Sequence, residues 1–240
     1  LTKIFRQAEA GKIIINAHRI NSGNLPEIDN GNENNDFYFV KVEESQRILE
    51  MIIELCKKNI PAKTGFTWET DIQILSPMHK GILGVKNLNL ELQRELNKHG
   101  EEIHSFPGGF RVGDKVMQIK NNYNKEVFNG DLGRVLLYDK IKLQLVVNFD
   151  GKTISYSAQE ADELTLAYAA TVHKAQGSEY PVIIMPVVNE HYIMLQRNLL
   201  YTAVTRGKSM VMLLGSIKAL SIAVNNNKAQ IRFTRLKEIL

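Results

Sequence analysis

The chain has 240 residues, a formal net charge of +4 at pH 7 and a single cysteine. This length suffices for one substantial hydrophobic core, or for one core and a small additional module. One cysteine excludes a disulfide framework and a cysteine metal cluster, no other metal site is predicted, and a reducing, cytoplasmic setting is expected. The lack of an apolar run of about 18 residues predicts no membrane partner, whereas the mildly basic charge suits a polyanion.

The first 105 residues predict helices that alternate with strands. Apolar residues at helical spacing from Ile13 to Ile20 predict a helix that ends at Asn21-Ser-Gly23. A polar, acidic loop is expected over 27–36. The later elements are strands over 37–42 and 71–76 and helices over 44–59 and 85–99. Strands that alternate with helices of this length indicate a mostly parallel, doubly wound sheet, so the expected fold class is α/β.

Helical periodicity disappears between residues 106 and 163. Asn129-Gly130 and Asp150-Gly151 are dipeptides typical of tight hairpin turns, and the second joins two strand-like runs. Several short strands in a segment of this length predict a small β-barrel. Because the α/β pattern resumes at Leu164, we expect the barrel to be an insertion. The predicted organisation is an α/β lobe over 1–105, a barrel over 106–163 and the rest of the lobe over 164–240.

Two polar segments, Thr171–Glu179 and Tyr201–Lys208, interrupt the apolar runs. Each lies at a junction of predicted elements, where charged ligands are commonly bound. No glycine-rich phosphate loop accompanies them, because Gly151-Lys-Thr153 and Gly207-Lys-Ser209 both lack the first glycine that such a loop requires. A strand that ends in a metal-holding Asp-Glu pair is missing too, and the chain begins at Leu1. We therefore expect a fragment whose nucleotide-binding first lobe lies upstream.

The two polar segments resemble motifs V and VI of superfamily 1 helicases, and more narrowly those of the RecD-like DNA helicases, the family of the exodeoxyribonuclease V alpha subunit. Val112–Gln118 and Val127–Gly133 resemble the barrel signature of that family. The resemblance implies a RecA-like second motor lobe of the P-loop type, without its own Walker A loop and with an inserted SH3-like barrel. It also implies the C-terminal half of an ATP-dependent DNA helicase, a hydrolase of DNA repair and recombination that moves 5′ to 3′.

The same resemblance implies the cofactors and partners. ATP and Mg²⁺ are expected, both held mainly by the N-terminal lobe. Single-stranded DNA and that N-terminal RecA-like lobe are the expected partners, and the sequence leaves open whether nuclease subunits join them. The isolated fragment is expected to be inactive, because the phosphate loop and the Mg²⁺ ligands are absent from it.

Two arginines are candidate catalytic residues. Charge that spreads over the γ-phosphoryl oxygens needs a cation from the far lobe, and arginine suits this role because its guanidinium is planar and always charged. Arg206, near the end of the second polar segment, is the first candidate. An arbitrary arginine in such a place would more often cap a strand end in a salt bridge. Arg6, in Ile4-Phe-Arg-Gln7, resembles the motif IV arginine, which in the family reaches the γ-phosphate.

The turn at Gln176-Gly-Ser-Glu179 is the candidate nucleotide contact. The family interpretation places the backbone of Gly177 near the γ-phosphate and the carboxylate of Glu179 near the ribose, with Gln176 in the same turn. Glycine permits close approach of backbone to phosphate, and a carboxylate accepts hydrogen bonds from ribose hydroxyls. The alternatives are a plain turn glycine and a solvated charge at a helix end.

The candidate nucleic-acid contacts are Thr171, His173 and Lys174 in the first polar segment, and Met78 and His79 where the chain leaves a predicted strand. Thr171 and His173 are expected to face away from the nucleotide, toward the DNA, where hydroxyl and imidazole groups contact phosphates and sugars. Lys174 is equally compatible with a phosphate contact and with a solvated charge.

Two other functions stay open at this point. A relaxase-helicase or a superfamily 1 RNA helicase has similar motifs V and VI, and the barrel segments favour the RecD-like branch over both. A protein of another class, a stand-alone module that binds nucleic acid or protein, could also derive from a motor lobe. Arg206 and Glu179 argue against this module, because a pure binder needs no γ-phosphate sensor.

Overall fold

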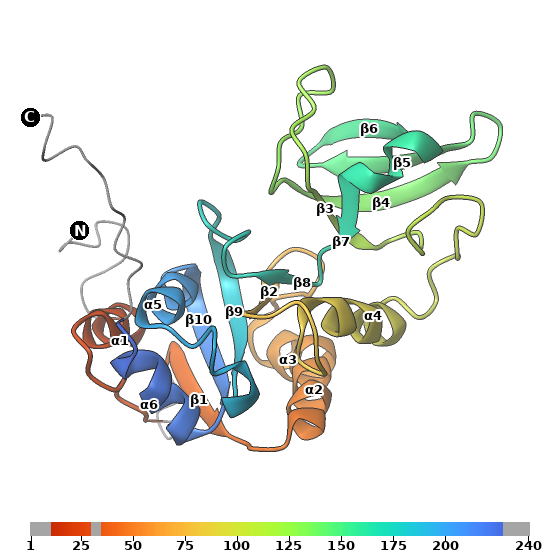
Figure 1. Ribbon diagram of the computed structural model, residues 1–240. Helices are drawn as coiled ribbons and strands as arrows, with labels where there is room; N and C mark the ends of the chain where they lie inside the picture. The colour runs from red at the N-terminus through yellow and green to blue at the C-terminus, as the bar shows by residue number, and fades with distance from the viewer. Residues whose placement is uncertain (1–10, 30–34, 228–240) are drawn as a thin grey trace, which may run out of the picture.

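The computed structural model describes residues 11–29 and 35–227, which form two five-stranded sheets (Figure 1). The first sheet is parallel, with the strand order β1-β10-β9-β2-β8. Its strands are β1 (Phe37–Lys41), β2 (Ile72–Ser76), β8 (Ala169–Thr171), β9 (Tyr180–Val187) and β10 (Gly207–Gly215). This is the parallel α/β lobe that the sequence predicts.

Helices cover both faces of the parallel sheet. One side carries α1, α5 and α6, and the other carries α2, α3 and α4 (Figure 1). Ile183 of β9 packs into the hydrophobic cluster on the first side, and Ile184 into the cluster on the second. Burial on both faces explains why this strand is a nearly continuous apolar run in the sequence. The helices are α1 (Lys12–Asn21), α2 (Ser45–Glu54), α3 (Ile60–Thr64), α4 (Val85–Leu96), α5 (Arg197–Val204) and α6 (Ile217–Asn225).

The helix predicted over 44–59 continues five residues further, to Thr64. A π-helical turn at Leu55–Asn59 joins α2 to α3, and Gly65, with φ +76°, caps the end. Pro61 lies inside this continuous helix, although its ring has no N–H and crowds the preceding turn. The wider π turn relieves that crowding, so the predicted end at residue 59 is wrong.

The second sheet is antiparallel, with the order β6-β5-β4-β3-β7. Asp150-Gly151 forms the predicted turn between β5 and β6, with φ values of +46° and +87°. Asn129-Gly130 also forms a tight turn, since the Asp131 N–H donates to the Phe128 carbonyl at 3.0 Å, but this turn lies at the base of a longer hairpin, residues 119–131, whose tip is closed by a bridge between Asn122 and Val127. The strands are β3 (Lys115–Gln118), β4 (Leu132–Asp139), β5 (Gln144–Phe149), β6 (Lys152–Ser157) and β7 (Leu164–Leu166), with 3₁₀ turns at Ala158–Glu163 and Asn189–His191.

A buried carboxylate joins the second sheet to the lobe. Asp114, directly before β3, accepts hydrogen bonds from the Tyr168 hydroxyl (2.7 Å), the Asn97 amide (2.7 Å), the Gln93 amide (2.6 Å) and the Arg111 N–H (2.6 Å). These donors come from α4 and from the segments on both sides of the second sheet. The joint therefore fixes where β3 leaves the lobe.

A buried amine adds a second connection. Lys115 Nζ donates to the carbonyl of Ile72 in β2, at 3.0 Å. Burial lowers the pKa of Lys115 to about 8, because desolvation disfavours the ammonium. The chain returns from the second sheet through β7, where Leu166 pairs with Val116. The boundaries predicted at residues 106 and 163 stay predictions. Within the described residues, every helix is too short or too polar to cross a lipid bilayer.

Candidate nucleotide and nucleic-acid interface

The ends of the parallel strands form two edges of the first sheet. At the carboxyl edge, Thr171 ends β8 opposite Ser76, the last residue of β2. At the amino edge, Tyr180 begins β9, two residues before the residue that pairs with Ile72. Since Ser76 lies four residues beyond Ile72, the two edges are six residues apart, roughly 20 Å along the strands. Residues 172–179 therefore connect one edge to the other.

The connection begins as a compact turn. The Thr171 carbonyl accepts hydrogen bonds from the N–H groups of Lys174 (3.0 Å) and Ala175 (3.2 Å), and Thr171 Oγ1 accepts from the Lys174 N–H (3.3 Å). Val172 and Ala175 are buried, which anchors the turn, and His173 is exposed. The turn thus presents His173 to solvent and holds Lys174 at the carboxyl edge.

A small cavity lies beside this turn and adjoins a larger one. The smaller one, about 90 Å³, is lined by Thr171, Lys174 and His79 among other residues. The larger one, about 340 Å³, also contacts His79 and extends to Lys86 on α4. Residues of β7 line both cavities, so the second sheet forms one wall. Met78 is half-buried on the same loop, and its carbonyl accepts a hydrogen bond from the N–H that starts α4 at 2.9 Å.

The structure therefore brings His79 together with Thr171 and Lys174, two predicted nucleic-acid contacts that lie far from it in sequence. Burial lowers the pKa of Lys174, because desolvation disfavours its charged form. An anion in the cavity would oppose that effect, since a nearby negative charge favours the ammonium. The carboxyl edge is thus a partly enclosed site with cationic side chains.

Arg206 lies at the amino edge, between α5 and β10. Its guanidinium donates from Nη1 to the Ser178 carbonyl (3.1 Å), from Nε to the Thr202 carbonyl (3.3 Å) and from Nη2 to Thr205 Oγ1 (3.4 Å). The Arg206 carbonyl accepts from the Tyr180 N–H at 2.8 Å. These acceptors of the guanidinium are all neutral, so they hold the group in place without cancelling its charge.

Glu179 lies at the same edge and forms an ion pair with Lys208, 3.1 Å between Oε2 and Nζ. Lys208 follows Gly207, whose Cα is in register with Tyr180. The contribution of Lys208 is not evident from the sequence, because only the register of β9 with β10 brings it to Glu179. The available signal is that opposite charges stand at the starts of two predicted strands.

Gly177 provides an open stretch of backbone directly before Ser178, whose carbonyl binds Arg206. Its φ of +92° lies in the region that favours glycine, and a Cβ added there would have no atom within 4 Å. Gln176, the preceding residue, is exposed. Open backbone beside a fixed guanidinium fits the far-lobe side of a nucleoside triphosphate site. In residues 11–29 and 35–227, no three His, Cys, Asp or Glu side chains are grouped so as to hold a metal ion.

The structure therefore places Glu179 and Arg206 at the amino edge and Thr171, Lys174 and His79 at the carboxyl edge. Gln176 belongs to the turn between them, because its N–H donates to the His173 carbonyl at 3.2 Å. Arg6 lies outside the described residues, so its predicted γ-phosphate contact stays a prediction.

Comparisons with known proteins give two family matches. Residues 88–149 match the family described as the SH3 domain of ATP-dependent RecD-like DNA helicases. Residues 166–214 match the family described as the UvrD-like helicase C-terminal domain. The first match covers α4 and most of the second sheet, and the second covers the segment that contains both edges.

Curated relatives and solved structures agree with these matches. The chain is 36% identical over 241 aligned residues to the ATP-dependent RecD2 DNA helicase of Deinococcus radiodurans, covering 99% of this chain and 31% of that protein. It is 28% identical to the RecBCD enzyme subunit RecD of Haemophilus influenzae, over 75% of this chain and 29% of that protein. The chain therefore spans about a third of the length of these relatives.

Two Pif1 helicase structures share the fold. One, from Bacteroides and solved in complex with ADP-AlF3 and single-stranded DNA, matches with a TM-score of 0.57 and 22% identity, over 92% of this chain and 52% of that one. The other, from Candida albicans, matches with a TM-score of 0.56 and 18% identity, over 99% of this chain and 60% of that one. At these identities the likeness concerns the fold alone.

Proposed function

We propose that this chain, which belongs to the RecD-like family of superfamily 1 DNA helicases, forms the second motor lobe of an ATP-dependent helicase that moves 5′ to 3′ along single-stranded DNA. One observation carries the proposal. Residues 172–179 join the cavity-lined carboxyl edge to the arginine-bearing amino edge. A motor needs such a connection, because hydrolysis of the nucleotide must alter the contacts with the DNA along which the protein moves.

The amino edge would serve the nucleotide. ATP supplies the γ-phosphoryl group whose transfer to water drives the motor. Arg206 would neutralise charge on that group, and the backbone of Gly177 would approach it closely. Glu179 would accept a hydrogen bond from the ribose, with Gln176 beside it. The phosphate loop and the Mg²⁺ ligands would come from the first RecA-like lobe.

The carboxyl edge would serve the DNA. Thr171 and His173 would contact phosphates or sugars, and Lys174 would place an ammonium beside them. Met78 and His79 would extend the contact along the loop that follows β2. Contacts of this kind position the strand without reading its sequence, which suits a protein that moves along DNA.

Arg206 also supports coupling of the two edges. It is bonded to the Ser178 carbonyl through its guanidinium, and to the Tyr180 N–H through its own carbonyl. Both partners belong to the end of the connection that starts at Thr171. If Arg206 moves when the γ-phosphate leaves, the connection must move with it.

Substitution of Arg206 in the intact protein tests this function. Arg206→Ala should lower the DNA-stimulated ATPase rate by about 10³-fold or more, the scale of an arginine finger. Arg206→Lys should recover little of that loss, because the planar fork is missing. Arg94→Ala, which removes an exposed arginine from α4, is the matched control and should leave the rate unchanged.

A near-normal ATPase rate in Arg206→Ala would contradict the proposal. If the normal protein and Arg206→Ala both bind DNA and neither hydrolyses ATP, the stand-alone binding module would be favoured instead. The two functions are thus separated by one variant and two measurements.

A further inference from the structure

The hairpin at residues 119–131, between β3 and β4, exposes two aromatic rings. Tyr123 is 74% exposed and Phe128 is 44% exposed. Their ring centroids lie 6.0 Å apart with an interplanar angle of 73°, an edge-to-face pair. Exposed aromatic side chains in contact with each other form an apolar surface that water solvates poorly.

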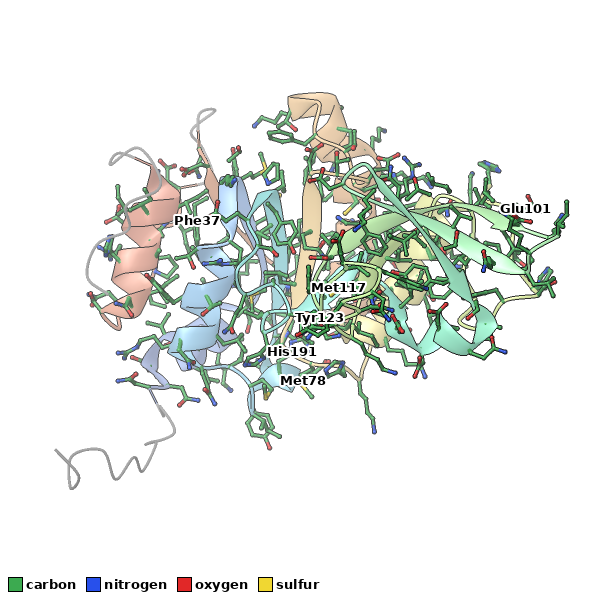
Figure 2. The ribbon with its side chains drawn as sticks, turned by 90° about the horizontal axis from the view of Figure 1, so that it is seen from above. Phe37, Met78, Glu101, Met117, Tyr123 and His191 are labelled. Carbon is green, nitrogen blue, oxygen red and sulfur yellow. The ribbon has the colours of Figure 1, made fainter. Side chains whose placement is uncertain are left out.

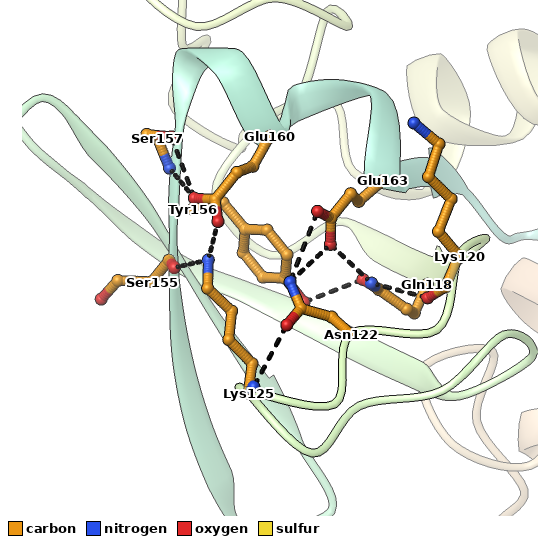
Figure 3. A network of polar contacts seen from close by, with 9 residues as sticks. All are labelled: Gln118, Lys120, Asn122, Lys125, Ser155, Tyr156, Ser157, Glu160 and Glu163. Atoms are coloured by element: carbon orange, nitrogen blue, oxygen red, sulfur yellow. Dashed lines mark hydrogen bonds and ion pairs between the residues drawn. The ribbon is translucent and has the colours of Figure 1, made fainter.

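The tip of the hairpin is held firmly, so the exposure belongs to the fold. Asn122 and Val127 exchange two backbone hydrogen bonds of 2.8 and 3.2 Å across it. The Asn122 amide donates to Glu163 Oε2 at 3.1 Å, and Lys125 forms an ion pair with Glu160 at 2.6 Å (Figure 3). Both carboxylates belong to the 3₁₀ turn that follows β6. The hairpin is therefore clamped to the rest of the second sheet.

The base of the hairpin is also anchored. Gln118, at the end of β3, donates from Nε2 to Glu163 Oε2 (2.8 Å) and accepts at Oε1 from the Tyr156 hydroxyl (2.9 Å) (Figure 3). Gln118 and Tyr156 are fully buried. A ligand that contacts the two exposed rings would thus meet a surface already in position, which lowers the ordering cost of binding.

The hairpin meets the connection between the two edges of the lobe. A Cβ added at Gly130 would lie 3.9 Å from the carbonyl oxygen of Lys174. Phe128 is two residues from Gly130, and Lys174 lines the cavity that also contains Thr171 and His79. Viewed from above, Tyr123 lies over the region where the two sheets meet (Figure 2). The base of the hairpin therefore lies beside the turn that begins at the carboxyl edge, and Phe128 stands two residues further along the hairpin, which rises from there away from the lobe (Figure 1).

We infer that Tyr123 and Phe128 form a stacking platform for a nucleobase of the single strand whose backbone follows Thr171, His173 and Lys174. The inference rests on the proposed function and adds a base contact to it. Every base has a π-face, so aromatic stacking holds a strand without selecting its sequence. A backbone site with an adjacent aromatic platform is how proteins bind single strands without sequence preference.

The test compares two oligonucleotides with the same backbone. One is a short oligothymidylate, and the other is an abasic oligomer of the same length. Fluorescence anisotropy with the intact protein gives both affinities, and the normal protein should prefer the oligothymidylate. Tyr123→Ala with Phe128→Ala should weaken oligothymidylate binding about tenfold, the loss of roughly one stacked base. The affinity for the abasic oligomer should stay unchanged, so the preference disappears.

Two further variants complete the design. Tyr123→Trp keeps an aromatic face and should retain the preference for bases. Ile141→Ala with Leu143→Ala removes two exposed apolar side chains, 95% and 61% exposed, from another turn of the same sheet and should change neither affinity. Melting temperatures should be unaltered throughout, because these side chains are exposed.

An equal loss for both oligonucleotides in the Tyr123→Ala, Phe128→Ala protein would overturn the inference, since the pair would then act on the backbone or on another part of the protein. Unchanged binding of both would overturn it as well. Failure of the normal protein to bind either oligonucleotide would remove the proposed function and this inference together. Loss of the base preference with retained binding of the abasic oligomer is the outcome that supports it.

Discussion

The two edges of the parallel sheet present different chemical groups. The carboxyl edge, around Thr171, is enclosed by the second sheet and contains cavities lined by side chains. The amino edge, around Tyr180, consists of open glycine backbone, a guanidinium held by neutral oxygens and an ion pair. Side chains around a cavity suit an extended polymer, whereas open backbone and a fixed cation suit a phosphate group. The eight residues 172–179 thus connect two different surfaces, which is the arrangement that the proposed function requires.

The largest expected effect on binding distinguishes the carboxyl edge from the amino edge. In the intact protein, Thr171→Ala with His173→Ala should weaken single-stranded DNA binding about a hundredfold or more, the loss of two hydrogen bonds to charged groups. Nucleotide affinity without DNA should be retained. Glu179→Ala should do the reverse. Fluorescence anisotropy with labelled DNA and with a labelled nucleotide gives both quantities.

Salt sharpens that experiment. The DNA affinity lost in the Thr171→Ala, His173→Ala protein should be similar for unrelated sequences and should shrink at high salt, because phosphate contacts carry little sequence information. If both sets of variants only lower the melting temperature, with binding per folded molecule unchanged, the segment is structural and the two-edge interpretation fails.

The next effect tests whether the carboxyl edge depends on the second sheet. Asp114→Ala leaves the Tyr168 hydroxyl without its acceptor and removes one of the two acceptors of each of the Asn97 and Gln93 amides, so the free energy of unfolding should fall by about 2–3 kcal/mol. Urea unfolding measures this. Glu101→Ala removes an exposed carboxylate paired with Lys140 and should change stability by less than about 0.5 kcal/mol.

The opposite result for Asp114 would be informative too. If Asp114→Ala unfolds at the same urea concentration as the normal protein, the buried joint does not hold the second sheet in place. The wall that β7 contributes to the cavities would then need another explanation.

The next effect, about 1 kcal/mol, is the pH dependence of the free energy of unfolding that buried Lys115 causes. The pKa of Lys115 is about 8 in the folded protein, against 10.5 for an ordinary lysine. Between these values the unfolded chain binds more protons, so the free energy of unfolding rises with pH. From pH 8 to pH 9 the normal protein should gain about 1 kcal/mol relative to Lys115→Met. Equilibrium unfolding at both pH values measures the difference.

Buried Cys56 acts in the opposite direction at higher pH. Burial raises the pKa of its thiol from 9.0 to about 12, so the unfolded chain loses that proton first and stability falls from about pH 8 upward. Cys56 is present in both the normal protein and Lys115→Met, so the difference between the two proteins isolates Lys115. A constant difference between normal protein and Lys115→Met from pH 8 to pH 9 would show that the amine titrates as it does in the unfolded chain.

The smallest expected effect concerns the ion pair at the amino edge. Lys208→Met should lower the free energy of unfolding by less than about 1 kcal/mol, because Lys208 is 54% exposed and solvent screens the pair. Thermal unfolding measures the change. A loss of several kcal/mol would mean that this edge is built more like the enclosed one.

Much of the lobe could be predicted because its burial leaves a simple pattern in the sequence. β9 is apolar at most positions since it is buried on both faces, and the turn at Asp150-Gly151 needs residues that tolerate positive φ. The pairing of Lys208 with Glu179 could not be read in this way, because it depends on the register of two strands. The sequence likewise does not predict that Asn129-Gly130 lies at the base of a longer hairpin, because the bridge that closes the tip joins Asn122 and Val127, residues of no distinctive type.

The candidate site also has features that the sequence predicts and features that only the structure reveals. Motif resemblance predicts functional roles for Thr171 and Arg206, and the structure adds that these two residues lie at two edges roughly 20 Å apart. The cavities and the contact of Gly130 with Lys174 depend on how the second sheet rests on the lobe. That arrangement is set by the buried groups at Asp114 and Lys115, which look like ordinary surface charges in the sequence.

The path of the chain through β3 and β7 has a consequence for how the protein can vary. The chain leaves the lobe along β3 and returns along β7, and these two strands are hydrogen-bonded neighbours through Val116 and Leu166. The outgoing and returning segments thus lie side by side where they join the lobe. Residues can be added or removed at the far turns of the second sheet without changing the distance between β3 and β7, so the strand register in the lobe would be preserved. The reach of the hairpins can therefore change independently of the geometry of the parallel lobe.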